Sequence, residues 1–255
     1  EAAIRQSGVD LVFNLVESLG GQGRLIQTAP ALLDTMGVPY TGCPSDAVWL
    51  TSNKLVAKKL LTAAGVATPE WFTLDQLERG TTVPGGRYII KSVWEHASRG
   101  LDDASVVETS RPETLAAALR ERLPLLGGEG FAERYIDGRE FNLSLLAIEQ
   151  PRGKAENPVL PRCEILPPAE IVFDGYDSGK PRVVGYRAKW DEGSFEYHHT
   201  PRRFDFGLQD ASLLRTLHAT ARDCWDCFGL RGYARVDFRV DPQGKPQPLK
   251  GIKLK

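Results

Sequence analysis

The sequence predicts a fold of mixed helices and strands, of the α/β or α+β class. Two observations lead to this prediction: strand-like and helix-like segments alternate along the 255 residues, and no internal repeat or low-complexity tract interrupts them. With 42% hydrophobic and 25% charged residues, the chain has enough apolar mass for a packed core. The length suits one large domain or two to three small ones.

The first predicted elements are a strand and a helix. Residues 9–15 are predicted to form a buried strand, because the run is largely apolar, and a glycine-rich loop follows over 20–23. Residues 25–36 have helical spacing and precede Gly37, a residue that commonly ends helices. The segment 38–40 is expected to be extended.

Two short helices and a strand are predicted next. Residues 45–49 open one helix, and Ser52 is expected to cap the following helix over 53–64, which Gly65 ends. Residues 88–93 are predicted to form a strand after a glycine turn.

From residue 112 onward, the sequence predicts two helices and three strands. A proline near the start of one helix and an Asp-Gly turn between two strands mark their limits. These elements are the helices 112–123 and 208–228 and the strands 131–135, 141–148 and 233–240. Residues 151–168 are rich in proline and lack periodicity, which indicates a long connection.

Charge and hydropathy exclude several classes of protein. Lysine and arginine number 32 against 33 aspartates and glutamates, so the formal net charge of -1 lacks the basic excess of a nucleic-acid binder. The apolar runs are too short to span a bilayer, and no signal peptide is visible. We therefore expect a cytoplasmic protein with neither nucleic-acid nor membrane partners.

Four cysteines in a chain of this length do not predict a disulfide scaffold. Cys224 and Cys227 form a CxxC pair, which a redox protein or half of a zinc site would also contain. Cys224 falls on the apolar face of a predicted helix, so we favour a structural role and keep the redox or zinc protein as the weaker hypothesis.

The strand over 233–240 alternates apolar and charged residues. Arg235, Asp237 and Arg239 share one face, and for this strand alone a solvated face is the favoured interpretation. The alternative is that Asp237 holds a cation while Arg235 faces an anion, as in a site for a metal and a nucleotide.

Other segments would also suit a bound nucleotide. Lys91 ends an apolar run and precedes a loop of small residues that can offer N–H groups and a hydroxyl to phosphate, although this loop is not a Walker A motif. Glu133 closes one strand and Glu140 begins the next, so this hinge can present groups to adenine and ribose. Lys189 is expected between extended segments.

The order of these segments resembles the D-alanine–D-alanine ligase branch of the ATP-grasp superfamily. Ten short pieces carry the resemblance, in the family's order and across nearly the whole chain: DLVFN (10–14), GGQG (20–23), PYTG (39–42), NK (53–54), IK (90–91), EHASRG (95–100), AE (132–133), REF (139–141), AKW (188–190) and GYARVD (232–237). Each piece is modest, but the ordered set is specific.

The resemblance implies an ATP-grasp fold that binds the nucleotide between two α+β subdomains. It implies a partial N-terminal α/β domain over 1–50 and ATP-grasp subdomains over 51–133 and 134–255. The implied activity is that of an ATP-dependent ligase, which joins a carboxylate to an amine through an acyl phosphate and releases ADP and phosphate. ATP and Mg²⁺ are the implied cofactors, amino acids or related carboxylates the substrates, and a homodimer is compatible with the family.

The resemblance also implies roles for individual residues around the phosphates. Lys54 and Lys91 match the two lysines that contact the nucleotide phosphates, and Ser98 matches a serine of the flexible loop that covers them. Lys189 matches a lysine near the γ-phosphate. Arg235 matches the arginine that stabilises the acyl-phosphate and tetrahedral intermediates.

The remaining implied roles concern the nucleoside and the metal. Glu133 matches the hinge residue that contacts adenine, and Tyr135 and Ile136 match the adjoining adenine wall. Glu140 matches the ribose ligand, and Asp237 matches a magnesium ligand.

Several positions depart from the family pattern. Glu17 stands where the family has histidine, Ala97 where it has serine, and Trp190 where it has tyrosine. The last two suggest a different amino acid or carboxylate, or a looser pocket. Lys250 and Ile252 replace a Glu-x-Asn motif that supplies further magnesium ligands, which motivates the alternative of a nucleotide-binding protein without ligase activity.

The family also has a first strand, a glycine-rich loop and a substrate-binding glutamate before the point that matches Glu1. We therefore expect either a truncated or degenerate chain or one that lacks some stretches of the family sequence.

Overall fold

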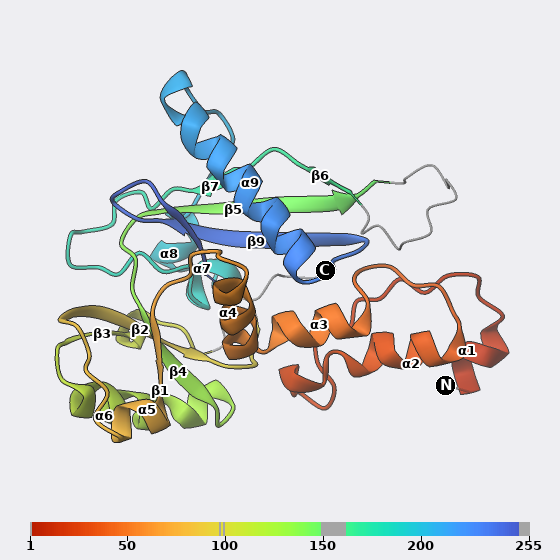
Figure 1. The fold of residues 1–255 in the computed structure, drawn as a ribbon, viewed down its shortest axis with the longest axis horizontal. Helices are drawn as coiled ribbons and strands as arrows, with labels where there is room; N and C mark the ends of the chain where they lie inside the picture. The colour runs from red at the N-terminus through yellow and green to blue at the C-terminus, as the bar shows by residue number, and fades with distance from the viewer. Residues whose placement is uncertain (1, 97, 99, 149–161, 250–255) are drawn as a thin grey trace.

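The computed structural model describes residues 2–96, 98, 100–148 and 162–249. Two antiparallel sheets organise this part of the chain (Figure 1). The smaller sheet has the strand order β1-β4-β2-β3, and α5 and α6 lie beside it. Its elements are β1 Trp71–Thr73, α5 Leu74–Glu78, β2 Gly86–Ser92, β3 Val106–Thr109, α6 Pro112–Arg122 and β4 Gly130–Arg134, with 3₁₀ turns at Asp103–Ser105 and Leu123–Leu126.

The larger sheet has the order β10-β9-β5-β7-β8, and β6 also pairs with β5. Its strands are β5 Arg139–Ala147, β6 Cys163–Ile165, β7 Ala169–Ile171, β8 Arg202–Arg203, β9 Tyr233–Val240 and β10 Pro246–Pro248. The register of β5 and β9 sets Glu140 opposite Arg239 and Asn142 opposite Asp237. Polar side chains from two neighbouring strands therefore share one face of this sheet.

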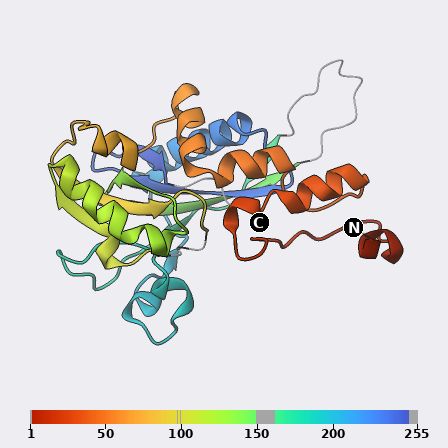
Figure 2. The ribbon, with the colours of Figure 1, turned by 90° about the horizontal axis from the view of Figure 1, so that it is seen from below.

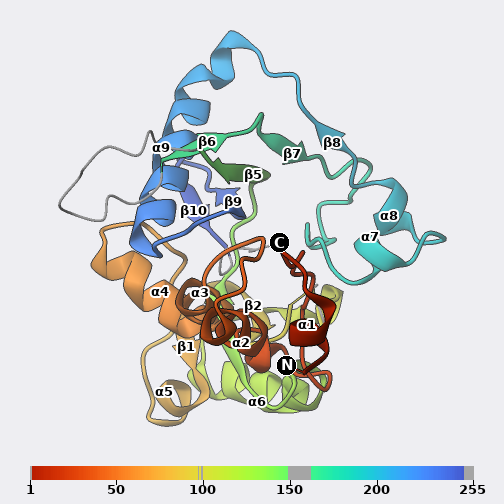
Figure 3. The same ribbon diagram turned by 90° about the vertical axis from the view of Figure 1, so that its right-hand side faces the viewer.

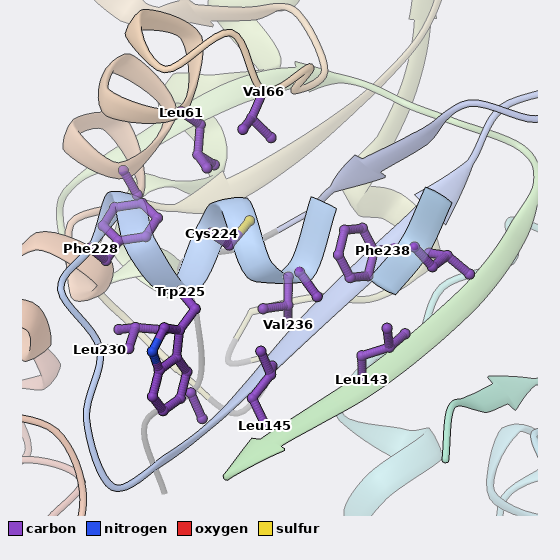
Figure 4. Close-up of a cluster of buried hydrophobic side chains, with 14 of the residues drawn as sticks. Leu61, Val66, Leu143, Leu145, Cys224, Trp225, Phe228, Leu230, Val236 and Phe238 are labelled. Atoms are coloured by element: carbon purple, nitrogen blue, oxygen red, sulfur yellow. The ribbon is translucent and has the colours of Figure 1, made fainter. Parts of the chain in front are cut away.

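The opposite face of β9 forms the main core. Val236 and Phe238 are fully buried, and they pack with Leu143 of β5 against α9 Ala211–Cys227, which a 3₁₀ turn at Leu208–Asp210 precedes. Figure 4 shows Cys224 and Trp225 among these apolar side chains. The alternation predicted for this strand is confirmed, because the sheet separates its apolar face from its charged face. The favoured interpretation of the charged face as solvated was wrong, since Asp237 and Arg239 are only 6% and 4% exposed.

The N-terminal part contains helices but lacks the predicted buried strand. Its elements are α1 Ala2–Ser7, a 3₁₀ turn at Gly23–Leu25, α2 Thr28–Met36, α3 Ser45–Ser52 and α4 Lys54–Ala63. Over 9–15 the described chain forms only an isolated parallel bridge between Val12 and Tyr40, and Phe13 and Leu15 are 65% and 70% exposed. The strand prediction was wrong because burial requires neighbouring strands on both sides, which an apolar pattern alone does not provide.

The end of α2 agrees with the sequence prediction, whereas the residue that caps the start of α4 does not. Gly37 adopts the left-handed conformation at the end of α2, as its position predicted. Ser52 ends α3 and does not cap α4; the Asn53 side chain accepts hydrogen bonds from the N–H groups of Leu55 and Val56. The expected domain boundary between residues 50 and 51 falls within α3, and the expected boundary between residues 133 and 134 falls within β4.

Two further predictions in the second half need correction. Lys189 lies in a short helix, α7 Arg187–Trp190, rather than between extended segments, and α8 Phe195–His198 follows it. The predicted long connection contains β6, and residues 149–161 lie outside the described part of the chain. Figure 2 shows the segment with α7 and α8 projecting from the body of the molecule.

A short hinge over 135–138 joins the two sheets, which Figure 3 shows on opposite sides of the molecule. A Cβ atom on Gly138 would lie 1.8 Å from the carbonyl oxygen of Val240, so only glycine fits where the hinge meets the end of β9. Within the described ranges, no helix is long and apolar enough to cross a membrane.

Candidate active site

Glu133 of β4 lies between two lysine side chains. It is fully buried, and its two carboxylate oxygens form ion pairs with Lys91 of β2 and, at 2.8 Å, with Lys58 of α4. Burial alone would raise the pKa of Glu133, but the two ammonium groups outweigh it and hold the pKa below its usual value. This carboxylate is therefore charged and already paired.

Lys54 begins α4 and holds the start of the small-residue loop. Its Nζ donates hydrogen bonds to the carbonyl oxygens of Val93 at 3.2 Å and Glu95 at 2.9 Å, and its side chain is buried. The structure therefore brings Lys54 to the predicted phosphate loop.

Ser98 connects that loop to the segment carrying Lys189. Its hydroxyl donates to the carbonyl oxygen of Val184 at 2.8 Å and accepts from Nζ of Lys189 at 2.5 Å. Ser98 has a φ of 65°, in the left-handed region that residues other than glycine rarely adopt. Two residues that are far apart in the sequence are thus brought together.

A narrow cleft lies between the two sheets. Its described walls include Lys91 and Glu133 from the smaller sheet, Tyr135 and Ile136 from the hinge, and Glu140, Asp237 and Arg239 from the larger sheet. The open space is only about 40 Å³. The Arg182 N–H donates to the Tyr135 hydroxyl at 2.8 Å, and burial raises the pKa of that hydroxyl.

Arg239 fills part of this cleft and pairs with Glu140. Its guanidinium lies 2.8 Å from Glu140 Oε2, donates to the Gly138 carbonyl at 2.9 Å and to the Arg182 carbonyl, and lies over the ring of Phe173. Glu140 is thus held in a fixed position at the base of the cleft.

Arg235 and Asp237 form a second charged pair beside the cleft. Arg235 donates to both oxygens of Asp237 at 2.7 and 3.2 Å, and Asn142 of β5 donates to Asp237 at 2.9 Å. Burial would lower the pKa of Arg235, but the carboxylate outweighs it and the pKa lies above its usual value. This pairing orients the guanidinium.

A larger cavity of about 700 Å³ adjoins the cleft, since both are lined by Glu140 and Asp237. Lys189 and Arg235 contribute cationic groups to its wall. The same wall carries three aromatic side chains: Trp190, Tyr197 and Phe204. A cleft with acidic and basic groups therefore opens into a roomier, partly aromatic chamber.

The sequence prediction gave no role to Lys58, Asn142 or Arg239, although it placed Arg239 on the charged face of its strand. For Lys58 a signal was present, because the buried residues of α4 are Lys54, Ala57, Lys58 and Leu61, so both lysines occupy the apolar stripe of the helix. A lysine in such a stripe needs a buried partner.

Among the departures from the family, Trp190 is 59% exposed and Glu17 is also exposed. Ala97, Lys250 and Ile252 lie outside the described residues.

Cys224 lies in the core. Burial is the main cause that raises the pKa of its thiol, and the nearby Cys227 and Asp223 raise it further. In the described ranges, no group of three or more His, Cys, Asp or Glu side chains could hold a metal. The structure thus gives no support to the redox or zinc hypothesis.

No protein-family model matches the chain. It is 31% identical over 254 residues to a D-alanine–D-alanine ligase of Synechococcus sp. (strain JA-2-3B'a(2-13)), a match that covers 96% of this chain and 66% of the relative. It is also 31% identical over 249 residues to the D-alanine–D-alanine ligase of Methylococcus capsulatus, which covers 96% of this chain and 69% of the relative.

The solved structure of the Bacillus anthracis D-alanine–D-alanine ligase complexed with ATP is similar, with a TM-score of 0.64 and 19% identity over 98% of this chain and 70% of that one. The chain spans about two thirds of the length of the curated relatives it matches. The two-sheet architecture is the ATP-grasp fold. On sequence similarity and coverage, the chain belongs to the D-alanine–D-alanine ligase family.

Proposed function

We propose that this protein is an ATP-dependent carboxylate–amine ligase that forms a peptide or amide bond through an acyl phosphate. The observation that carries the proposal is the cleft between the two sheets, which is lined by buried acidic and basic groups. This cleft adjoins a chamber whose wall includes Lys189 and Arg235. Its relatives are named D-alanine–D-alanine ligases, and one similar structure is complexed with ATP.

The nucleotide would lie between subdomains 51–133 and 134–255. Tyr135 and Ile136 would form the adenine wall, and the hinge backbone together with Glu133 would face the adenine edge. Glu140, held by Arg239, would accept hydrogen bonds from the ribose hydroxyls.

Phosphate binding would use groups that contact one another in the structure. Lys91 reaches the cleft from β2, while Lys54 orders the start of the loop that carries Ser98. Ammonium and hydroxyl groups of this kind neutralise and orient phosphate oxygens.

In the reaction, a carboxylate oxygen of the first substrate attacks the γ-phosphorus, and the bond from that phosphorus to the bridging oxygen of ADP breaks. The amine of the second substrate then attacks the acyl carbon, the bond from that carbon to the phosphate oxygen breaks, and phosphate leaves while the amine loses a proton. Lys189 would neutralise charge on the transferred phosphoryl group, and Arg235 would do so on the acyl phosphate and the tetrahedral intermediate. Positioning and charge neutralisation supply most of the catalysis in such transfers.

The residues present fit a magnesium ion shared with the nucleotide. Proteins usually hold Mg²⁺ through one or two carboxylates plus substrate phosphates. Asp237 supplies a buried carboxylate that lines both cavities, and Glu140 lies nearby on the neighbouring strand β5. Asp237 would hold the ion. When bound, the ion would neutralise negative charge on the phosphate groups.

The substrates would be small amino acids or related carboxylates, and the protein would act in the cytoplasm. The aromatic wall that includes Trp190 leaves room for side chains larger than the methyl group of alanine.

The test is to incubate the protein with ATP, Mg²⁺ and a panel of D- and L-amino acids, and to measure phosphate release and amide products by mass spectrometry. Arg235→Met should lose product formation, whereas Arg215→Met, at an exposed arginine of α9 that lines neither cavity, serves as the matched control. Tight ATP binding without product across the panel would favour a nucleotide-binding protein without ligase activity.

A further inference from the structure

Lys58 is a buried charge that the proposed roles leave without a function. Its Nζ has three oxygen neighbours: Thr68 Oγ1 at 2.7 Å, the Pro69 carbonyl at 2.9 Å and Glu133 Oε2 at 2.8 Å. An ammonium group has three protons, one for each of these oxygens. Burial lowers the pKa of Lys58 below its usual value, and the Glu133 carboxylate opposes this shift by favouring the charged form. Lys58 is 5% exposed and is not among the described residues that line the cleft.

The two lysines around Glu133 outnumber its single negative charge. Lys58 and Lys91 each contribute one positive charge and Glu133 one negative charge, so the three buried groups carry a net charge of about +1. If Lys58 were absent, Lys91 and Glu133 would cancel, and a phosphate approaching Lys91 would also meet an unbalanced carboxylate. In a buried site, where screening by water is weak, this difference is large.

We propose that Lys58 is a positioning residue of the nucleotide site, which binds one oxygen of Glu133 and so leaves the charge of Lys91 available to phosphate. This inference rests on the proposed function, because it assumes that phosphate binds in the cleft beside Lys91. Lys58 acts through Glu133 and does not touch the nucleotide.

A purely structural role for Lys58 makes a different prediction. In that case its loss would lower stability, but the folded protein would bind ATP as before. In the positioning role, the folded Lys58→Met variant binds ATP more weakly, and removal of the Glu133 charge restores binding, because Lys91 alone again provides the net positive charge.

The experiment measures the dissociation constants of ATP and of adenosine by calorimetry, with folding of each protein checked by circular dichroism. Lys58→Met should weaken ATP binding on the order of tenfold, the effect of an interaction worth one pKa unit. Its affinity for adenosine, which has no phosphate, should change less than about twofold. Lys59→Met removes the same charge from the exposed neighbouring residue and should change neither constant.

Rescue provides the decisive comparison. The double variant Lys58→Met with Glu133→Gln should recover the ratio of ATP affinity to adenosine affinity to within about threefold of the original protein's ratio, a difference of less than ~1 kcal/mol. The ratio is compared because Glu133 is also proposed to face adenine, and adenosine binding registers any loss of that contact. If Lys58→Met does not fold, the double variant decides alone, because a lowered ratio of ATP affinity to adenosine affinity in this protein, where Lys91 alone supplies the positive charge, would overturn the inference. Unchanged ATP affinity in folded Lys58→Met would overturn it as well, whereas failure of the unaltered protein to bind ATP would refute the proposed function itself.

Discussion

Glu133→Gln should destabilise the protein far more than the same change at an exposed ion pair. The substitution removes the only carboxylate that Lys58 and Lys91 contact among the described residues, and both lysines remain buried. Removing one partner from a buried ion pair costs about 3–5 kcal/mol, which corresponds to a fall of about 6–20 °C in the melting temperature for a chain of this size.

The matched control is Glu78→Gln. Glu78 lies 2.7 Å from Arg120, but the two side chains are 44% and 55% exposed, so water screens the pair. We expect a loss of at most about 1 kcal/mol, or less than about 4 °C. Thermal unfolding followed by circular dichroism measures both variants, and equal shifts for the two would refute the reasoning.

The pH dependence of the same comparison provides a second check. Because the pKa of Glu133 is lowered in the folded protein, its contribution to stability is fully present above the ordinary glutamate pKa of about 4.3 and is lost as the pH falls through the lowered folded pKa. The difference in unfolding free energy between the original protein and Glu133→Gln should therefore be constant near pH 7 and should narrow below about pH 4.3. A gap that widens on acidification would contradict the assigned charge state.

Three further predictions concern the site and the core. Lys91→Ala should lower ATP turnover by about 10²-fold or more, because one preorganised cation is lost, and initial-rate measurements of phosphate release check this; unchanged turnover would contradict the phosphate role. Asp237→Asn should shift the Mg²⁺ dependence of turnover to higher concentration, and an unaltered titration curve would remove the metal role. Cys224 should resist a thiol reagent at pH 8 in the folded protein and react after unfolding in urea, because burial raises the pKa of its thiol; equal labelling of Cys224 and the partly exposed Cys227 before unfolding would argue against the core placement.

The elements that could be predicted from the sequence are those specified by local pattern. The alternation of β9 fixed which of its residues enter the core, since side chains of a strand alternate between two faces regardless of what lies further along the chain. Proline at the start of α6 and glycine after α2 likewise marked their helix ends correctly. Residues 9–15 show the limit, because an apolar run does not reveal whether a neighbouring strand covers it.

The candidate site residues were named mainly from ordered motifs, and the pairings among their side chains were not predicted. Arg239 and Glu140 are 99 residues apart in the sequence and meet only because β5 and β9 pair in one register. The contact of Lys58 with Glu133 similarly requires α4 to pack beside β4. Charge partners across elements follow from tertiary packing, so local periodicity could indicate that Lys58 is buried but could not identify its partner.

The small volume of the cleft has a consequence for the rate at which a nucleotide is captured. Sites for ligands of this size usually offer about 300–1,000 Å³, whereas the space between the sheets is about 40 Å³. Arg239 and Tyr135 both contact the backbone of Arg182 there. Under the proposed placement of adenine, these contacts would have to rearrange before the purine enters. In a stopped-flow experiment, the observed rate of ATP binding should therefore level off as the ATP concentration rises, with the plateau set by that rearrangement rather than by diffusion.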